Sequence, residues 1–474
     1  MFSDRAATKS LPKLHLCAVM LVLLLPFLLG NNKGCGTAAP STFIAISDVH
    51  FNPFDDTTLF DRLVAAPAED WDEIFQSSTK TALPAYGEES NFTLLSKALD
   101  SATSHDANPA VVIFPGDILC HNFKTTFDNL YGSVDQDALE SFIMKTVRFF
   151  VLQVRERFID APVLFTLGNN DSYAGDYDLV AGGDFLAETA DLFKNQWLDD
   201  WVQSSTFNQS YKAGGYYTAS VSKKSIRLVS LNSVLFTTHR PAPVAGDAAY
   251  IQLDWFEEQL AAAQNSGQQV YVVTHVPPGT NIYSTIANHM DAQGRIADVD
   301  DMWHDGYQTR FLAIMEAYPN LSITFFSGHT HMDEFRLIYN DARSNTPATV
   351  LGQPAISPVF ENNPAYKVFN VNIENWELQD YTAQALRLDQ SSEKFSQEYK
   401  FTTQYNLSNA TAPSMAALSN SLALGGEDKT SYIQYYYSGS PRSPITETNW
   451  HGYRCSTGFV RADKYKTCVN NSVP

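Results

Sequence analysis

The feature that most limits the fold of this chain is a series of short apolar segments, each ending at polar residues or glycine. These segments are rich in β-branched or aromatic residues and show no polar alternation, which is typical of buried strands. They are Thr42–Ser47, Ala110–Phe114, Val163–Leu167, Ile226–Leu231, Val270–Thr274 and Leu321–Ser327. Helix-like stretches such as Asp137–Phe158 and Ala248–Ala263 lie between them. The alternation predicts an α/β domain built on largely parallel sheet.

Chemically active side chains follow most of these segments directly. They are Asp48, His50, Asp117, Asn169, His275, His329 and His331. In an open α/β sheet the carboxyl ends of the strands form the crevice where ligands bind. A helix cap or a turn explains each of these residues when it is taken alone. Coincidence is a poor explanation for the whole set, so the sequence predicts a binding site at one edge of the sheet.

Carboxylate, amide and imidazole groups are ligands for divalent cations. Two cations roughly 3.5–4 Å apart can activate a water molecule and hold phosphoryl oxygens during phosphate ester hydrolysis. Asp117 is the candidate for a carboxylate shared by both cations, because Gly116 before it lets the backbone turn sharply at the strand end. The residues therefore predict a hydrolase of phosphoric esters that depends on a dinuclear metal centre.

The spacing of these residues also resembles a known family. The motifs Asp48-x-His50, Gly116-Asp117, Gly168-Asn169-Asn170-Asp171, Thr274-His275 and Gly328-His329-x-His331 are similar, in order, to the blocks of the calcineurin-like metallophosphoesterase superfamily. The stretches Thr274–Gly279, Gly328–Phe335 and Ser357–Pro364 resemble its acid sphingomyelinase-like branch. The resemblance implies a four-layer α/β/β/α sandwich and a phosphodiesterase acting on a small-molecule or lipid phosphoester.

Carried over by residue, the resemblance implies two sets of metal ligands. One cation would be bound by Asp48, His50, Asp117 and His331, and the other by Asp117, Asn169, His275 and His329. The branch commonly binds zinc, although such ligands also accept manganese or iron. His121 matches a histidine near the scissile phosphate, where an imidazole can protonate the departing oxygen.

Asn170 departs from the family, which usually has a histidine at this position. An amide can contact a phosphoryl oxygen but cannot supply a proton. Fungal vacuolar endopolyphosphatases of the branch share the Asn-Asn-Asp form, so an endopolyphosphatase is one alternative. A catalytically retired metal-binding protein is another. The net charge of −20 argues against polyanions and against duplex nucleic acid as partners, because few basic residues can line a channel for them.

The two ends of the chain predict a secretory signal segment and a C-terminal subdomain. Residues 1–35 read as a signal peptide or anchor, since Arg5, Lys9 and Lys13 precede the apolar run Leu14–Leu29. The run is shorter than the roughly 20 residues that span a bilayer, which favours cleavage over a signal-anchored membrane form. Residues 40–374 form the expected catalytic domain, without the saposin-like module of the full acid sphingomyelinase. Residues 375–474 form a C-terminal, partly helical subdomain.

Cysteines and sequons support the same compartment. Cys455 and Cys468 close a short loop and predict a disulfide in an oxidising environment. Sequons stand at Asn91, Asn208, Asn320, Asn406, Asn409 and Asn470. We therefore expect a secreted or lumenal glycoprotein, outside the cell or in a lysosome-like or vacuole-like compartment, with peripheral membrane contact left open. Oligomeric state is not predicted.

Overall fold

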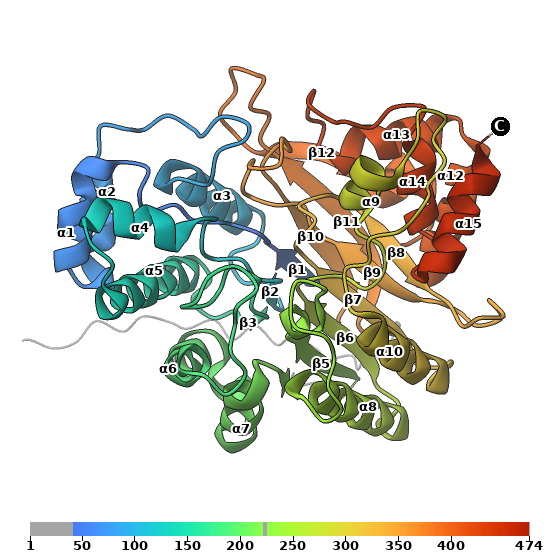
Figure 1. Ribbon diagram of the computed structural model, residues 1–474, viewed down its shortest axis with the longest axis horizontal. Helices are drawn as coiled ribbons and strands as arrows, with labels where there is room; N and C mark the ends of the chain where they lie inside the picture. The colour runs from blue at the N-terminus through green and yellow to red at the C-terminus, as the bar shows by residue number, and fades with distance from the viewer. Residues whose placement is uncertain (1–40, 221–224, 474) are drawn as a thin grey trace, which may run out of the picture. The chain divides into compact units, whose positions relative to one another are not determined.

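Two six-stranded sheets form the centre of the computed structural model, which describes residues 41–220 and 225–473 (Figure 1). The first sheet has the order β12-β11-β10-β1-β2-β3, and the second has the order β4-β5-β6-β7-β9-β8. The strands of the first sheet are β1 (Ser41–Ala45), β2 (Val112–Phe114), β3 (Val163–Phe165), β10 (Ala365–Asn372), β11 (Glu377–Ala385) and β12 (Ser396–Lys400). Those of the second are β4 (Tyr217–Ala219), β5 (Ile226–Leu231), β6 (Gln269–Thr274), β7 (Ile323–Ser327), β8 (Phe335–Ile338) and β9 (Ala348–Gly352).

All six expected strands are present, and they form parallel parts of the two sheets, at one end of the first and in the middle of the second. β1, β2 and β3 pair in parallel in the first sheet, and β5, β6, β7 and β9 do so in the second. The remaining pairings are antiparallel and extend the sheets. The stretch Val350–Asn372 is divided between both sheets, because β9 joins the second sheet and β10 the first.

Helices lie between the strands and also follow the last of them. They are α1 (Phe60–Ala65), α2 (Trp71–Gln76), α3 (Phe92–His105), α4 (Phe123–Tyr131), α5 (Gln136–Arg157), α6 (Asp184–Phe193), α7 (Ser204–Gly214), α8 (Ala248–Ser266), α9 (Ile282–His289), α10 (Asp305–Ala317), α11 (Phe401–Gln404), α12 (Ala412–Leu424), α13 (Glu427–Tyr436), α14 (Trp450–Ser456) and α15 (Ala462–Ser472). Short helical turns are η1 (Thr57–Leu59), η2 (Ala68–Asp70), η3 (Lys194–Leu198), η4 (Asp199–Trp201) and η5 (Ser233–Phe236).

The two helices expected from the sequence are confirmed, with ends set by capping residues. The carboxylate of Asp135 accepts a hydrogen bond from the backbone N–H of Ala138 at the start of α5. Asp247 does the same for the N–H of Tyr250 at the start of α8. Such caps satisfy N–H groups that have no partner within the helix. α8 ends at Gly267, whose φ of 64° is the left-handed conformation that terminates many helices.

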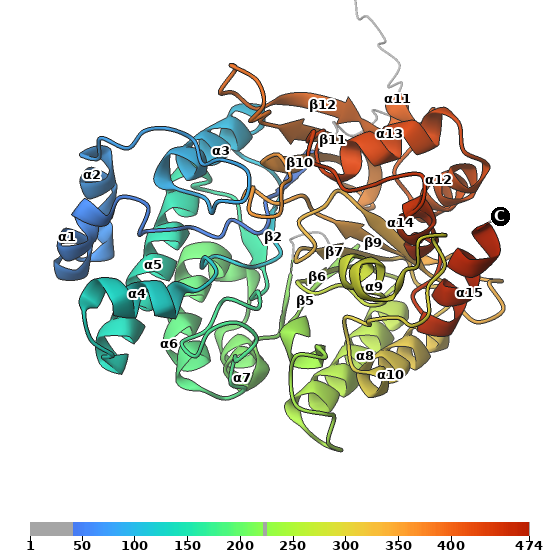
Figure 2. The same ribbon diagram turned by 45° about the horizontal axis from the view of Figure 1, so that its top comes forward.

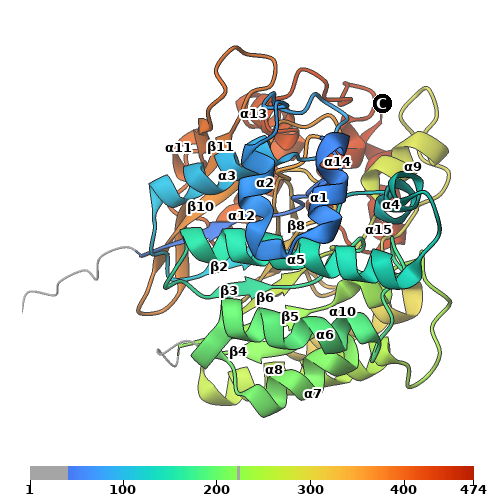
Figure 3. The same ribbon diagram turned by 90° about the vertical axis from the view of Figure 1, so that its left-hand side faces the viewer.

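The sheets pack face to face and helices cover their outer sides. Phe43 of β1 contacts Phe326 of β7 with ring centroids 5.4 Å apart, which joins the two inner faces. Phe150 of α5 packs on Phe114 of β2, while α8 packs on β5 and β6. Figures 1 and 3 show α3 and α5 outside the first sheet and α8 outside the second. The four-layer α/β/β/α architecture is therefore confirmed.

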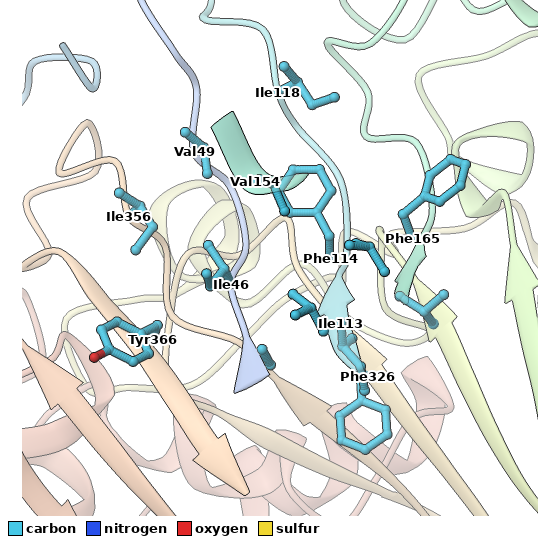
Figure 4. Packing of buried hydrophobic residues seen from close by; sticks show 14 of the residues in the cluster. Ile46, Val49, Ile113, Phe114, Ile118, Val154, Phe165, Phe326, Ile356 and Tyr366 are labelled. Carbon is cyan, nitrogen blue, oxygen red and sulfur yellow. The ribbon is translucent and has the colours of Figure 1, made fainter. Parts of the chain in front are cut away.

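Buried apolar side chains anchor the loops that leave the strand ends (Figure 4). Ile46 and Val49 flank Asp48, Ile118 follows Asp117, and Ile356 lies near the end of β1; each is at most 2% exposed. Burying a side chain of this size contributes about 1.5–3 kcal/mol relative to exposing it. The polar loops are thus fixed to the core on both sides of their functional residues.

The C-terminal part packs on the second sheet and also extends the first. α12 packs on β8 and β9, and residues beyond 374 supply β11 and β12 to the first sheet (Figure 2). The domain boundary at 374/375 therefore stays a prediction. The predicted disulfide is confirmed, since Cys455 of α14 is bonded to Cys468 of α15. Residues 1–35, the predicted signal or anchor, lie outside the described residues, in which no helix is both long and apolar enough to cross a membrane.

Candidate metal centre

The loops at the strand ends hold their functional residues in an uncommon backbone conformation. Positive φ angles occur at Asp48 (47°), His50 (45°), Asp117 (60°), His329 (72°) and His331 (64°). A non-glycine residue in this region costs on the order of 1–3 kcal/mol and persists only where the surroundings enforce it. Backbone strain gathered at one set of residues is typical of a functional site.

Four of the predicted ligands meet on one side of the cluster. Nε2 of His50 lies 3.0 Å from Nε2 of His331 and 3.3 Å from Oδ2 of Asp117. Nε2 of His331 lies 3.6 Å from Oδ1 of Asp48. The structure thus brings together the four side chains that the resemblance assigns to the first cation.

The other predicted ligands meet on the opposite side of Asp117. Oδ1 of Asn169 lies 2.8 Å from Nε2 of His275 and 2.9 Å from Nδ1 of His329. Nε2 of His275 lies 3.3 Å from Oδ2 of Asp117, the oxygen that is also 3.3 Å from His50. Asp117 therefore stands between the two groups, in the position that a shared ligand requires.

Backbone and side-chain groups orient these ligands from behind. Nδ1 of His275 donates to the carbonyl of Pro115 at 2.8 Å, and Nδ1 of His50 donates to the carbonyl of Leu119 at 3.1 Å. The side-chain amide of Asn169 donates to Oδ1 of Asp176 at 2.6 Å. This bond turns the Oδ1 of Asn169 toward the cluster. Partners of this kind fix the tautomer and ring orientation of metal-binding histidines.

The arrangement fits divalent cations. A cation with ligands at 2.0–2.2 Å in tetrahedral geometry separates neighbouring ligand atoms by about 3.3–3.6 Å, and the observed separations are 2.8–3.6 Å. Potential ligand atoms of Asp48, Asp117 and His275 all lie within 4.8 Å of one another, as do those of Asp48, His50 and His331. Two buried carboxylates this close repel each other unless a cation compensates them.

The pKa shifts match those of metal ligands with two exceptions. Burial lowers the pKa of His50 to about 4 and holds the pKa values of His329 and His331 well below their usual range. Burial opposes ionisation of Asp117, but the imidazoles of His275 and His50 outweigh it and lower its pKa. Neutral imidazoles and an ionised carboxylate are the forms that bind cations.

His275 and Asp48 are the exceptions. Burial would lower the pKa of His275, but the charge of Asp117 and a hydrogen bond to it raise the pKa to about 9. Burial raises the pKa of Asp48 to about 7. A cation held by these two side chains would displace the proton from each.

The two predicted catalytic residues also lie at the cluster. The ring of His121 stacks on that of His50, with centroids 4.4 Å apart, and its side chain is 27% exposed. Asn170 is buried, and its side-chain amide donates to Oδ2 of Asp117 at 3.1 Å while its backbone N–H donates to Oδ1 at 2.8 Å. The amide of Asn170 therefore holds the shared carboxylate in place.

Three acidic residues of the site have no role in the sequence prediction. Glu89 receives a hydrogen bond of 2.7 Å from Nδ1 of His121, and Asp176 orients Asn169. Asp171 accepts from the backbone N–H groups of Asp117, Ile118, Leu119 and Gly168, which ties two of the loops together. Only Asp171 had a signal, its place inside the Gly-Asn-Asn-Asp motif. Glu89 and Asp176 reach the site through loops that carry no motif.

Glycines in the motifs are required by close contacts. A Cβ at Gly328 would lie 2.5 Å from Oγ of Ser47 and 2.6 Å from Oδ2 of Asp48. A Cβ at Gly168 would lie 2.0 Å from Oδ1 of Asp117. Neighbouring loops can approach one another this closely only where the side chain is a hydrogen atom.

Comparison with known proteins identifies relatives of this chain. A family model described as "Calcineurin-like phosphoesterase" matches residues 41–333. "Sphingomyelinase phosphodiesterase C" of Dictyostelium discoideum is 24% identical over 320 residues, covering 65% of this chain and 64% of that protein. "Acid sphingomyelinase-like phosphodiesterase 3b" of Homo sapiens is 23% identical over 461 residues and covers 92% of each chain. "Sphingomyelinase phosphodiesterase D" of Dictyostelium discoideum is 25% identical and covers 96% of each.

Proposed function

Because this chain belongs to the calcineurin-like phosphoesterase family, and is thereby a hydrolase of phosphoester bonds, we propose that it is an acid sphingomyelinase-like phosphodiesterase with a dinuclear metal centre. The observation that carries the proposal is the position of Asp117, whose Oδ2 lies 3.3 Å from both His50 and His275. A carboxylate between two groups of imidazole and oxygen ligands is the arrangement that two-cation hydrolysis requires.

The proposed ligands are Asp48, His50, Asp117, Asn169, His275, His329 and His331. When bound, a pair of divalent cations lowers the pKa of water and neutralises the charge that develops on the phosphoryl group. Four imidazoles and two carboxylates favour zinc, with manganese and iron as alternatives to be separated by metal analysis. The residues of the chain orient the ligands and supply a proton for the departing oxygen.

We propose that Nε2 of His121 donates the proton to the departing oxygen. Nδ1 of this ring is bonded to Glu89 at 2.7 Å, so Nε2 is the nitrogen left for a substrate. Burial would lower the pKa of His121, but its hydrogen bond to Glu89 and the charge of that carboxylate raise it. A protonated imidazole beside the metal centre can donate to the departing oxygen, and such general acid catalysis contributes about 10²–10⁴-fold in rate.

The side chains around the centre favour a substrate with little negative charge. Glu89 and Asp176 lie next to it, and the whole chain has a net charge of −20. Phe360, which is 48% exposed, packs against the rings of His121 and His331 and offers an apolar surface beside the phosphate position. A phosphodiester with an organic or lipid group meets these features better than polyphosphate, which carries a charge on every unit.

A phosphoester panel tests the proposal. The purified protein is expected to hydrolyse bis-p-nitrophenyl phosphate and to lose that activity when a chelator removes its metals, which elemental analysis follows. Long-chain polyphosphate serves as the competing substrate. Faster cleavage of polyphosphate than of diesters would favour an endopolyphosphatase. A metal-loaded protein that is inactive on every phosphoester would favour the catalytically retired metal-binding protein.

Asn170→His distinguishes an active phosphodiesterase from a metal-binding protein that has lost its general acid. Because we assign the acid to His121, the substitution is expected not to raise kcat for diesters, and loss of the amide bond from Asn170 to Asp117 is expected to lower it. A missing general acid, once restored, would raise kcat about 10²–10⁴-fold. Single-turnover rates of the metal-loaded wild type and the variant decide, and a rise of 100-fold or more from a near-zero baseline would contradict the assignment of His121.

We further propose that the protein is secreted or lumenal. The Cys455–Cys468 disulfide supports this, because structural disulfides persist in oxidising compartments. Among the sequons, Asn320 and Asn406 are exposed, and we expect glycans there. Asn91 is buried and caps α3 through the N–H of Leu94, so it is not expected to carry a glycan.

A further inference from the structure

A buried ion pair directly follows the loop that carries His329 and His331. The side chains of Glu334 and Arg336 are 2% and 1% exposed, and Oε1 of Glu334 accepts from Nε and Nη2 of Arg336 at 3.1 and 2.9 Å. Arginine is almost never fully buried unless it is paired. Because removing both charges from water is costly, a pair that only had to fill space would be better replaced by apolar side chains. Filling space alone therefore does not explain the Glu334–Arg336 pair, and its other contacts indicate a further role.

Arg336 also contacts the loop that follows His275. Its Nη1 donates to the carbonyls of Pro278 and Thr280 at 2.9 and 3.0 Å. These carbonyls lie three and five residues beyond His275, while Glu334 lies three residues beyond His331. The single side chain of Arg336 thus connects two loops that leave different strands, β6 and β7, and that supply three of the seven proposed ligands.

Tyr436, the last residue of α13, completes the contacts of the pair. Its hydroxyl donates to Oε2 of Glu334 at 2.8 Å, and its carbonyl accepts from the backbone N–H of Asp333 at 3.0 Å. Tyr436 is 3% exposed, and its helix belongs to the C-terminal part of the chain. Both carboxylate oxygens of Glu334 therefore have donors, which satisfies the buried charge.

We propose that Glu334, Arg336 and Tyr436 form a clamp that positions the His275 loop and the His329–His331 loop for metal binding. The proposal rests on the dinuclear metal centre proposed above. His329 and His331 have positive φ, a conformation that persists only where the surroundings over-determine it. The clamp supplies that constraint, and it makes the C-terminal helices necessary for metal affinity although they contribute none of the proposed ligands. All three are positioning residues.

Tyr436→Phe tests the clamp with the ion pair left in place. The variant removes only the donor to Oε2 of Glu334. Tyr465→Phe is the matched control, because Tyr465 is also fully buried and its hydroxyl has no hydrogen-bond partner among the described residues. We expect Tyr436→Phe to weaken metal retention about 10–100-fold, the range for residues that orient metal ligands. Tyr465→Phe is expected to leave it unchanged.

Metal retention is measured as the chelator concentration that removes half of the bound cations, and the visible spectrum of the cobalt-substituted protein reports ligand geometry. A second variant, Glu334→Gln with Arg336→Met, removes both charges and is expected to keep a melting temperature near that of the wild type while still releasing metal more readily. Wild-type metal retention and an unchanged cobalt spectrum in Tyr436→Phe would overturn the clamp, whether or not the double variant folds. A folded wild-type protein that binds no metal would instead overturn the proposed function.

Discussion

Replacing Asp117 by Asn is expected to lower kcat/KM for phosphodiester hydrolysis by more than about 100-fold. Substituting a residue that only orients a metal ligand already lowers metal affinity or activity about 10–100-fold. Asp117 is the one side chain placed between both groups of proposed ligands. The amide keeps the shape of the carboxylate but removes its negative charge and one acceptor. Elemental analysis of the same preparations is expected to show fewer cations per chain than in the wild type.

Asp178→Asn is the matched control for Asp117→Asn. Asp178 belongs to the loop that also carries Asp176, but its side chain is exposed and contacts no proposed ligand among the described residues. It is expected to retain both activity and metal. If Asp117→Asn keeps two cations and wild-type kcat/KM, the dinuclear assignment is wrong even though the chain belongs to the family.

Lys367→Met is expected to lower the free energy of unfolding by about 3–5 kcal/mol, because it leaves a buried carboxylate without its partner. Nζ of Lys367 lies 2.6 Å from Oδ1 of Asp333 and donates to the carbonyl of Gly352 at 2.8 Å. The two side chains are 1% and 6% exposed. Tyr399 donates to the other oxygen of Asp333 at 2.7 Å, which cannot replace the lost cation.

Lys464→Met is the control for this loss, since Lys464 forms an exposed pair with Asp463 at 3.5 Å. Pairs of this kind contribute about 0–1 kcal/mol. Urea denaturation followed by tryptophan fluorescence measures both variants in the presence of saturating metal. Equal midpoints for the two variants would show that Asp333 is not held as a buried ion, and that β10 and the loop after His331 are not joined in this way.

The strand centres and the proposed ligands were predictable because their signals are local. A buried strand is recognisable from five or six consecutive, mostly apolar residues. Asp48, Asp117 and His275 follow such runs within three residues. Parallel strands of one sheet place their carboxyl ends at one edge, which brings Asp48 near Asp117. His275 follows a strand of the second sheet, so the single sheet edge expected from the sequence was wrong, and only the packing of the two sheets brings His275 to these carboxylates. His121 and Asn170 were found by resemblance, and the structure adds that Asn170 holds Asp117 through both its amide and its backbone.

Other features of the site depend on contacts between distant segments. Glu89 reaches His121 across 32 residues, and Tyr436 reaches Glu334 across 102. Neither side chain belongs to a motif, and a lone Glu or Tyr in sequence is more often a surface or packing residue. The split of Val350–Asn372 between two sheets was also not predictable, because the sequence of a strand does not state which strands it pairs with, and β9 and β10 have partners in different sheets.

The sequence by itself determined the positions of six strands and the class of chemistry, and it supplied the set of proposed ligands, since apolar runs, turn glycines and ligand spacing act over a few residues. Only the tertiary structure decided which carboxylate holds which histidine, how Arg336 joins the two histidine loops, and that the C-terminal helices take part in this arrangement. The physical reason is that hydrogen bonds and buried charges depend on distances of a few ångströms between segments, and packing sets those distances.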